Sequence, residues 1–369
     1  MAKNDISTKF NPRLGRKELD LLTRLCNAVS VSGDEQEVRA MVLEELRDFA
    51  DVTKVDAMGN VLVRREDAGE DRVRVMIAAH MDEVGFMIVK DEDDGVFEFR
   101  VIGGVDPRQL VGKPVIIGRD HVPGVIGAKA IHLTTPEERK QVLKVDQLRI
   151  DVGPGGDSKV KVGDRATFAT KLAILGPSIR SKALDDRLGV FNLIQLLKHA
   201  PENVDLLAAF TVQEELGLRG AKTAAYAFDP EIGIAMDSTP ANDLPHYDGL
   251  PNTSHNTRLG NGPAIYIMDR GTIGDQRLIK WLVDSAEAGK IPWQFRQPGL
   301  GGTDAGEIHK TRAGVPSVSV SVPQRYLHSA AGLIRIEDEL NTLKLIHTAL
   351  KRLDRSILNR QEKSNGKEK

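Results

Sequence analysis

The sequence predicts an α/β protein in which helices cover a mixed central sheet and a separate all-β, barrel-like domain is inserted. Three observations lead to this prediction. The apolar run from Val73 to Ala79, interrupted only by Arg74, lacks Gly and Pro and is typical of a strand buried on both faces of a covered sheet. Apolar stripes at helical spacing lie before and after it in the sequence. Between residues 84 and 173 the pattern changes to many short β-type runs.

Length and composition limit the class of protein. The 369 residues are enough for about two domains. The net charge of −2, from 51 basic and 53 acidic residues, lacks the excess of basic residues that is typical of nucleic-acid-binding proteins. No apolar run reaches the roughly 20 residues that span a bilayer, and the amino-terminal residues lack the apolar core of a secretory signal. With Cys26 as the single cysteine, predicted to pack in the core, we expect a cytoplasmic protein without disulfides, membrane contacts or nucleic-acid partners.

The amino-terminal part is predicted to contain two helices and two strands. Residues 16–30 carry apolar side chains at helical spacing. Ser32 and Glu35 have the spacing of a capping box ahead of a second helix that reaches Leu46. A Gly-Asn turn then precedes a strand that begins at residue 61, and the apolar strand at 73–79 follows.

Residues 84–173 are predicted to form the inserted β-domain, so that the α/β domain is discontinuous and comprises residues 1–83 and 174–369. The short runs are GFMIV, FEFRVI, PVIIG, VPGVIGAKAI, LRIDVG and RATFAT. Strands this short and this closely spaced are typical of a small antiparallel barrel or sandwich. One helix-compatible stretch, TPEERKQVL, interrupts them.

The α/β pattern returns after residue 174. A long helix is expected from about Asp186 to His199, and two apolar strands are expected to end at the Glu214-Glu215 pair and on Asp237. A polar stretch rich in Gly, Pro and Asn covers residues 238–262. The remaining expected elements are a strand at 264–268, a helix at 275–288, a strand, a Gly-rich loop, a short helix, another strand and a helix at 336–353.

Acidic and imidazole side chains gather where these elements end. The members are His80, Asp82, Asp185, Glu214, Glu215, Asp237 and His328. His80 and Asp82 lie two residues apart on extended backbone and therefore point the same way. In a parallel sheet such positions converge on one edge, where open α/β sheets place their ligand sites.

So many carboxylates at one edge repel one another unless a cation neutralises them. Imidazole and carboxylate ligands suit Zn²⁺, and also Co²⁺ or Mn²⁺. Five ligands exceed what one tetrahedral zinc with an open position requires. They suit two metal ions about 3.5–4 Å apart that share one carboxylate.

Five motifs in the chain resemble those of the M42 aminopeptidases: AAHMDEVGF, SKALDDRLG, TVQEELGLRGA, GGTDAGEIH and RYLHS. The resemblance covers about residues 15–355 and includes the insert. It implies a zinc-peptidase-like catalytic domain and a dinuclear exo-aminopeptidase that acts on short peptides, with two divalent ions per subunit, Zn²⁺ or Co²⁺. It also implies dimers that assemble into a tetrahedral dodecamer, with the insert serving oligomerisation.

The resemblance also implies roles for single residues. His80 would bind one metal and His328 the other, and Asp185 would bridge them. Glu215 would join one of the two metals, and Asp237 the other. Glu214 would be the general base, and Asp82 would hydrogen-bond His80 and fix its tautomer. The bridge is placed on Asp185 rather than its neighbour Asp186 by motif position alone.

Two other readings of the sequence stay open. A metal-dependent deacylase or amidohydrolase could use the same ligands on N-acylated small molecules. A non-catalytic scaffold could keep the fold, although it would be free to lose Glu214 or a ligand, and none is missing. An endoglucanase activity is disfavoured, because glycoside hydrolysis needs two carboxylates flanking the sugar. The glycines at 299–306 favour a loop close to the substrate, with Thr303 and Asp304 facing it.

Overall fold

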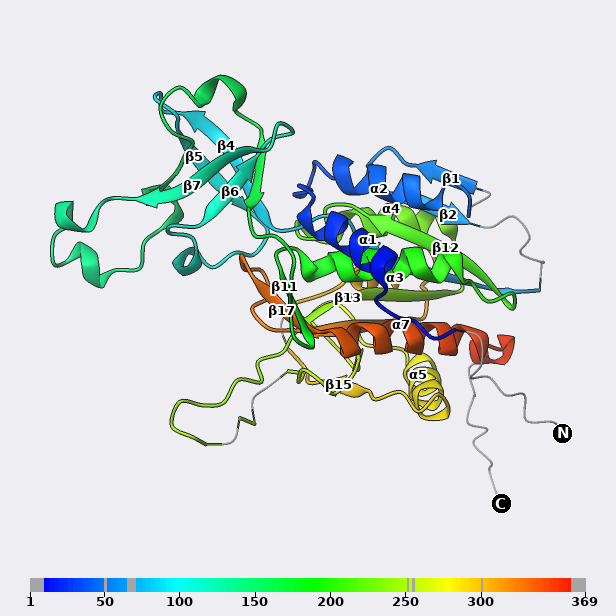
Figure 1. Cartoon of the computed structure of the whole chain (residues 1–369). Coiled ribbons are helices and arrows are strands. Elements are labelled where there is room, and N and C mark those ends of the chain that lie inside the picture. Colours follow the sequence, from blue (N-terminus) through cyan, green and yellow to red (C-terminus); the bar gives the residue numbers. More distant parts are fainter. Residues whose placement is uncertain are drawn as a thin grey trace, which may run out of the picture.

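The computed structural model describes residues 10–49, 52–64, 71–250, 252–253, 256–299 and 301–359. These residues form an eight-stranded mixed sheet, a closed six-stranded barrel and a small three-stranded sheet. Figure 1 shows the barrel to one side of the sheet and its helices. The predicted fold class, α/β with a barrel-like all-β part, is therefore confirmed.

The large sheet has the strand order β1-β2-β12-β3-β13-β16-β14-β15. The four strands at its centre, β12, β3, β13 and β16, run parallel, so their carboxyl ends meet at one edge. The sheet is mixed because β2 and β14 join this centre antiparallel. The bounds are β1 Val52–Val55, β2 Val61–Arg64, β3 Val73–His80, β12 Val204–Thr211, β13 Ile232–Pro240, β14 Ala264–Tyr266, β15 Gln294–Arg296 and β16 Ser317–Gln324.

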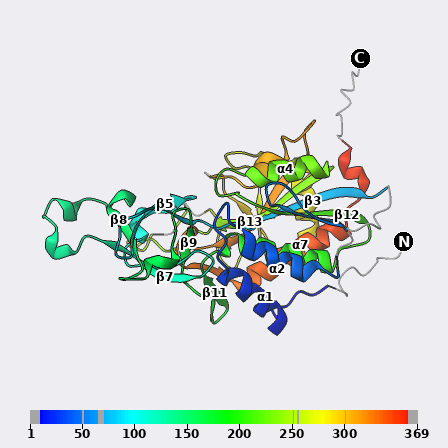
Figure 2. The same ribbon diagram turned by 90° about the horizontal axis from the view of Figure 1, so that it is seen from above.

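Helices cover both faces of the sheet, as the view from above shows (Figure 2). One face shares a core with α1, α2, α3, α5 and α7, and receives Val75 and Ile77 of β3. The other face receives Met76 and Ala78 and is covered by α4 and α6. Because side chains alternate along a strand, only an uninterrupted apolar run can fill both cores. The helices are α1 Arg16–Asn27, α2 Gln36–Leu46, α3 Leu184–Lys198, α4 Arg219–Phe228, α5 Gln276–Ala288, α6 Ala305–Ile308 and α7 Ile336–Lys351.

The barrel closes in the order β4-β5-β8-β7-β6-β9, and every pair in it is antiparallel. It has its own core, in which Phe86 meets Phe99 and Phe168 edge to face. Each of the six predicted β runs supplies one strand, while the domain boundaries at 84 and 173 stay a prediction. The strands are β4 Gly85–Asp91, β5 Val96–Ile102, β6 Pro114–Ile117, β7 Val122–Ala128, β8 Leu148–Asp151 and β9 Arg165–Phe168.

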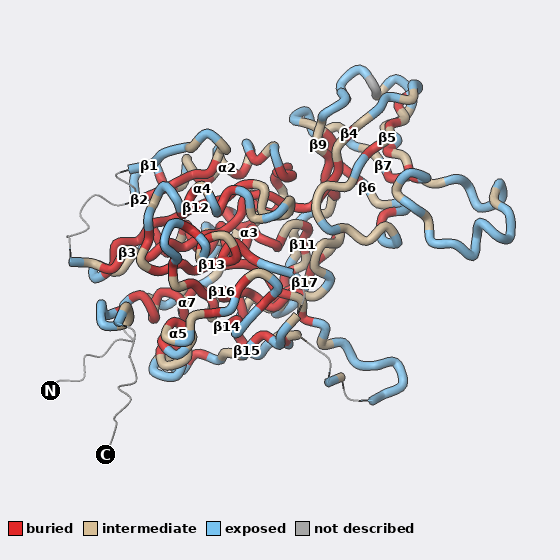
Figure 3. The backbone as a smooth tube through the Cα atoms, turned by 180° about the vertical axis from the view of Figure 1, so that it is seen from behind, coloured by how far each residue is buried: buried red, intermediate tan, exposed pale blue. Residues whose placement is uncertain are grey.

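The three-stranded sheet connects the barrel to the α/β body. β10 Ala173–Leu175 leaves the barrel and pairs with β11 Ser178–Ser181, which in turn pairs with β17 Gly332–Arg335. β11 leads into α3 and β17 leads into α7. The tube in Figure 3 shows the central strands buried and the outer loops of the barrel exposed.

Three local predictions were wrong. The second helix begins at Gln36 without a side-chain cap, because the Ser32 hydroxyl donates to Asp82 instead. The stretch TPEERKQVL forms only a 3₁₀ turn at Glu138–Lys140, since it is mostly exposed and offers no face to pack. Asp237 does not end its strand, because β13 continues beside β16 to Pro240.

Cys26 is fully buried, and burial raises the pKa of its thiol to about 12, as expected of a core residue rather than a nucleophile. Within the described ranges, no helix combines the length and apolar character needed to cross a bilayer.

Candidate metal centre

All seven predicted side chains meet at the carboxyl edge of the central strands. His80 is the last residue of β3, and Thr211, the last residue of β12, lies beside it in register. The Glu214-Glu215 pair follows β12 after two residues, and Asp237 lies on β13, the other neighbour of β3. Asp185 lies in the first turn of α3, and His328 follows β16.

Asp185 lies between the two histidines. Its Oδ1 is 3.1 Å from Nε2 of His80, and its Oδ2 is 3.2 Å from Nε2 of His328. One further carboxylate accompanies each imidazole: Asp237 Oδ1 is 3.8 Å from His80 Nε2, and Glu215 Oε1 is 3.3 Å from His328 Nε2. Asp185 therefore lies between two ligand groups, each with one imidazole and one further carboxylate. The first group is His80 with Asp237, and the second is His328 with Glu215.

The neighbouring Asp186 is oriented differently. Its Oδ2 accepts the backbone amide of His80 at 3.2 Å, and its Oδ1 accepts that of Gly189 at 2.9 Å. Two sets of side chains lie close enough together to hold an ion. One set is His80, Asp186 and Asp237, and the other is Asp185, Glu215 and His328. The geometry thus favours Asp185 over Asp186 as the residue between the two groups.

The electrostatics of the centre show an excess of buried negative charge. Burial and the neighbouring Asp185 raise the pKa of Asp237 to about 8, and burial raises the pKa of both Glu214 and Glu215. For His328, burial lowers the pKa, but the surrounding carboxylates outweigh it and raise the value to about 11. Burial and mutual repulsion thus disfavour the ionised form of Asp237, Glu214 and Glu215, and a cation beside them would offset that cost.

The residues present fit divalent cations. Among the described residues, Asp185, Glu215 and Asp237 form ion pairs with His80 and His328 only, and with no Lys or Arg. Glu215 Oε1 is buried and accepts no hydrogen bond within the described part of the chain. Two imidazoles and several carboxylates are a donor set suited to Zn²⁺ or Co²⁺.

Asp82 has more contacts than the sequence predicted. Nδ1 of His80 lies 3.1 Å from the main-chain carbonyl of Asp82 and 3.5 Å from its Oδ1. The same carboxylate accepts the backbone amides of Glu214 at 3.0 Å and Glu215 at 3.2 Å, and the hydroxyl of Ser32 at 2.6 Å. Asp82 therefore holds the His80 strand end and the Glu214-Glu215 turn together.

A buried charge network behind the centre was not predicted. Glu83 accepts from Lys182 at 2.8 and 2.9 Å, from Arg187 at 3.1 Å and from Thr167 of the barrel at 2.7 Å. Arg187 in turn donates to the carbonyls of Met81 and Asp82, directly beside His80. In the sequence Glu83 is only one acidic residue after a strand. Its partners could not be predicted, because they belong to elements about 100 residues away.

Thr303 and Asp304 are both buried. The hydroxyl of Thr303 is 2.7 Å from that of Ser319, and Asp304 accepts the hydroxyl of Thr211 at 2.5 Å. Burial raises the pKa of Asp304 to about 6. Both side chains thus connect the Gly-rich loop to the central strands, and their exposure to substrate stays a prediction.

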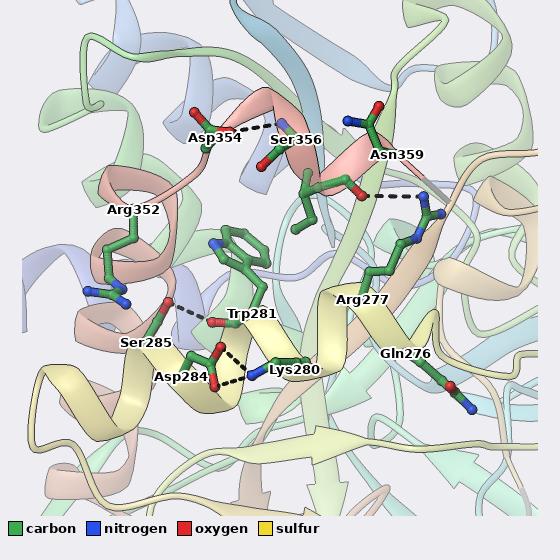
Figure 4. Close-up of a pocket in the computed structure, with 11 residues that line it drawn as sticks. Gln276, Arg277, Lys280, Trp281, Asp284, Ser285, Arg352, Asp354, Ser356 and Asn359 are labelled. Atoms are coloured by element: carbon green, nitrogen blue, oxygen red, sulfur yellow. Dashed lines mark hydrogen bonds and ion pairs between the residues drawn. The ribbon is translucent and has the colours of Figure 1, made fainter. Parts of the chain in front are cut away.

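A pocket between α5 and the segment after α7 lies apart from this centre (Figure 4). Its charged side chains are largely paired locally, Lys280 with Asp284 and Arg277 with Asp275. It contains none of the predicted site residues.

Comparison with known proteins shows the family of this chain. The family described as M42 glutamyl aminopeptidase matches residues 59–345. A putative aminopeptidase of Acetivibrio thermocellus is 35% identical over 336 residues, covering 90% of this chain and 98% of the relative. The protein is therefore a hydrolase of peptide bonds. It belongs to the M42 family of aminopeptidases, as the motifs predicted.

Two solved structures are similar over almost the whole chain. A TET aminopeptidase from the marine sediment archaeon Thaumarchaeota archaeon SCGC AB-539-E09 superposes with a TM-score of 0.88 at 34% identity, covering 93% of this chain and 99% of that one. The TET1 peptidase of Pyrococcus horikoshii, described as able to assemble into a tetrahedron or a large octahedral shell, gives 0.79 at 32% identity, with coverages of 91% and 100%.

Proposed function

We propose that the protein is an exo-aminopeptidase that removes amino-terminal residues from short peptides with two divalent metal ions. The observation that carries the proposal is the position of Asp185, whose two oxygens face two different histidines at 3.1 and 3.2 Å. A carboxylate placed in this way is what a pair of ions about 3.5–4 Å apart requires.

In this proposal His80 and Asp237 would hold one ion, Glu215 and His328 would hold the other, and Asp185 would contribute to both. When bound, such ions polarise the scissile carbonyl and activate a water molecule. Each imidazole would offer Nε2 as the ligand atom, because its Nδ1 lies beside a carbonyl oxygen that can only accept a hydrogen bond.

Glu214 is proposed as the general base. Its Oε2 lies 4.0 Å from His80 Nε2, on the edge of the centre, and its backbone amide is fixed by Asp82. From this position the carboxylate can take a proton from the attacking water and return it to the leaving amine. The surrounding acidic groups favour a substrate with a free, positively charged amino terminus.

The function is tested with aminoacyl-p-nitroanilides and with matched peptides whose amino terminus is free or acetylated. We expect the free-amine substrates alone to be cleaved, chelation to abolish cleavage, and Zn²⁺ or Co²⁺ to restore it. Full activity in protein shown by elemental analysis to lack metal would refute the mechanism. Efficient hydrolysis of acetylated peptides would instead favour the deacylase.

The roles of the two adjacent glutamates are separable by substitution. Glu214→Gln should retain two ions and lose most of kcat, by about 10²–10⁴-fold, because a positioned base contributes this much. Glu215→Gln should lose metal occupancy, and excess metal should partly restore its activity. Metal content and kcat are measured on both variants; swapped phenotypes would exchange the two roles, and a fully active Glu214→Gln would exclude Glu214 as the base.

We also propose that the chain forms a homo-oligomer through its inserted β-domain, with dimers assembling into a tetrahedral dodecamer. The segment between β7 and β8 exposes large apolar side chains, with Ile131 72%, Leu133 63% and Val142 65% exposed. Apolar groups gathered on a projecting segment are typical of a contact surface. Light scattering should give a mass well above that of one chain, whereas a fully active monomer at all concentrations would contradict the proposal.

A further inference from the structure

The two ligand groups differ in how they are attached to the fold. His80 is 3% exposed and belongs to a central strand, and Asp237 lies inside the neighbouring strand β13. His328 is 30% exposed and sits in the loop between β16 and β17, at a backbone φ of 55°. His80 and Asp237 are therefore anchored on strands of the sheet, whereas His328 lies on a loop and needs support from elsewhere.

The barrel supplies this support through the turn after β5. Nδ1 of His328 lies 2.9 Å from the carbonyl oxygen of Gly104. Because a carbonyl only accepts, Nδ1 carries the hydrogen, and Nε2 is left free to face Asp185 and Glu215. Gly104 thus sets both the tautomer and the direction of the ring.

Two further contacts tie the same ligands to the barrel. Ala330, two residues after His328, packs into the hydrophobic core of the barrel. Gly103 lies so close to Glu215 that a Cβ on the glycine would be 3.4 Å from the Cβ of the glutamate. The turn at Gly103–Gly104 therefore contacts His328 and lies next to Glu215, two of the three side chains of the second group.

We infer that the barrel is a working part of one metal site: the Gly103–Gly104 turn positions His328 and Glu215 and sets the affinity for the ion they would hold with Asp185. His80 and Asp237, which would hold the other ion, are linked to this turn only through the shared Asp185. The inference rests on the proposed dinuclear centre, and it makes Gly104 a positioning residue contributed by the inserted segment. Removing such outer support weakens metal affinity by about 10–100-fold.

Gly104→Ala isolates this contact. A Cβ at Gly104 would meet only the His328 ring, 3.3 Å from Nδ1 and 3.8 Å from Cε1, so the imidazole must move while the barrel need not. Gly127→Ala is the matched control, because Gly127 lies in β7 of the same barrel, its φ is not positive, and its Cβ would be 3.9 Å from the nearest neighbour.

The experiment titrates metal-free full-length protein with Zn²⁺ against a chromophoric chelator and records the Co²⁺ absorption spectrum of each variant. Wild type and Gly127→Ala should bind two ions with the same affinities. Gly104→Ala should keep one affinity unchanged and weaken the other about 10–100-fold, with a changed Co²⁺ spectrum and an unchanged unfolding temperature without metal.

The outcomes are distinguishable. Two unchanged affinities in Gly104→Ala, or an equal loss at both sites, would overturn the inference while leaving the proposed function intact. A wild-type chain that binds fewer than two ions would refute the dinuclear centre and this inference with it. If Gly104→Ala does not fold, Ala330→Gly is compared with wild type instead. The inference predicts a changed Co²⁺ spectrum in Ala330→Gly, and an unchanged spectrum would overturn it.

Discussion

The position of Asp185 is the constraint on which the rest of the centre depends. Its oxygens lie 3.1 and 3.2 Å from two histidines that are 248 residues apart in the chain and belong to different elements. Although burial raises the pKa of a carboxyl group, hydrogen bonds from His328 and His80 hold that of Asp185 below its ordinary value. It thus stays ionised at the point where the sheet edge, α3 and the loop after β16 meet.

The surrounding structure keeps this edge in place. Asp82 joins the end of β3 to the Glu214-Glu215 turn by accepting two backbone amides, and it also accepts the hydroxyl of Ser32. Behind it, Glu83 accepts from Lys182, Arg187 and Thr167, so one buried acid connects two cations of the α/β body to the barrel. Breaking such a buried network typically costs about 3–5 kcal/mol, because it leaves an uncompensated charge. The edge that carries the proposed ligands is therefore held by residues outside the ligand set.

The sequence predicted much of this arrangement because uninterrupted apolar runs and short, closely spaced β runs determine their own structure. The doubly buried strand ending at His80 and the six short barrel strands are examples. It did not predict the end of β13 beyond Asp237, because pairing with β16 extends the strand. Nor did it predict that the Ser32 hydroxyl donates to Asp82. The contact between Gly104 and His328 could not be predicted, because a backbone carbonyl carries no signal in the sequence and the two residues are 224 positions apart.

The most direct test of the account is the position of bound metal. Crystals of the protein soaked in Zn²⁺ should be measured on both sides of the zinc absorption edge. The account predicts two anomalous peaks about 3.5–4 Å apart. One peak should lie between Asp185, His80 and Asp237, and the other between Asp185, Glu215 and His328. A single peak, or peaks that Asp185 does not contact, would contradict the shared carboxylate.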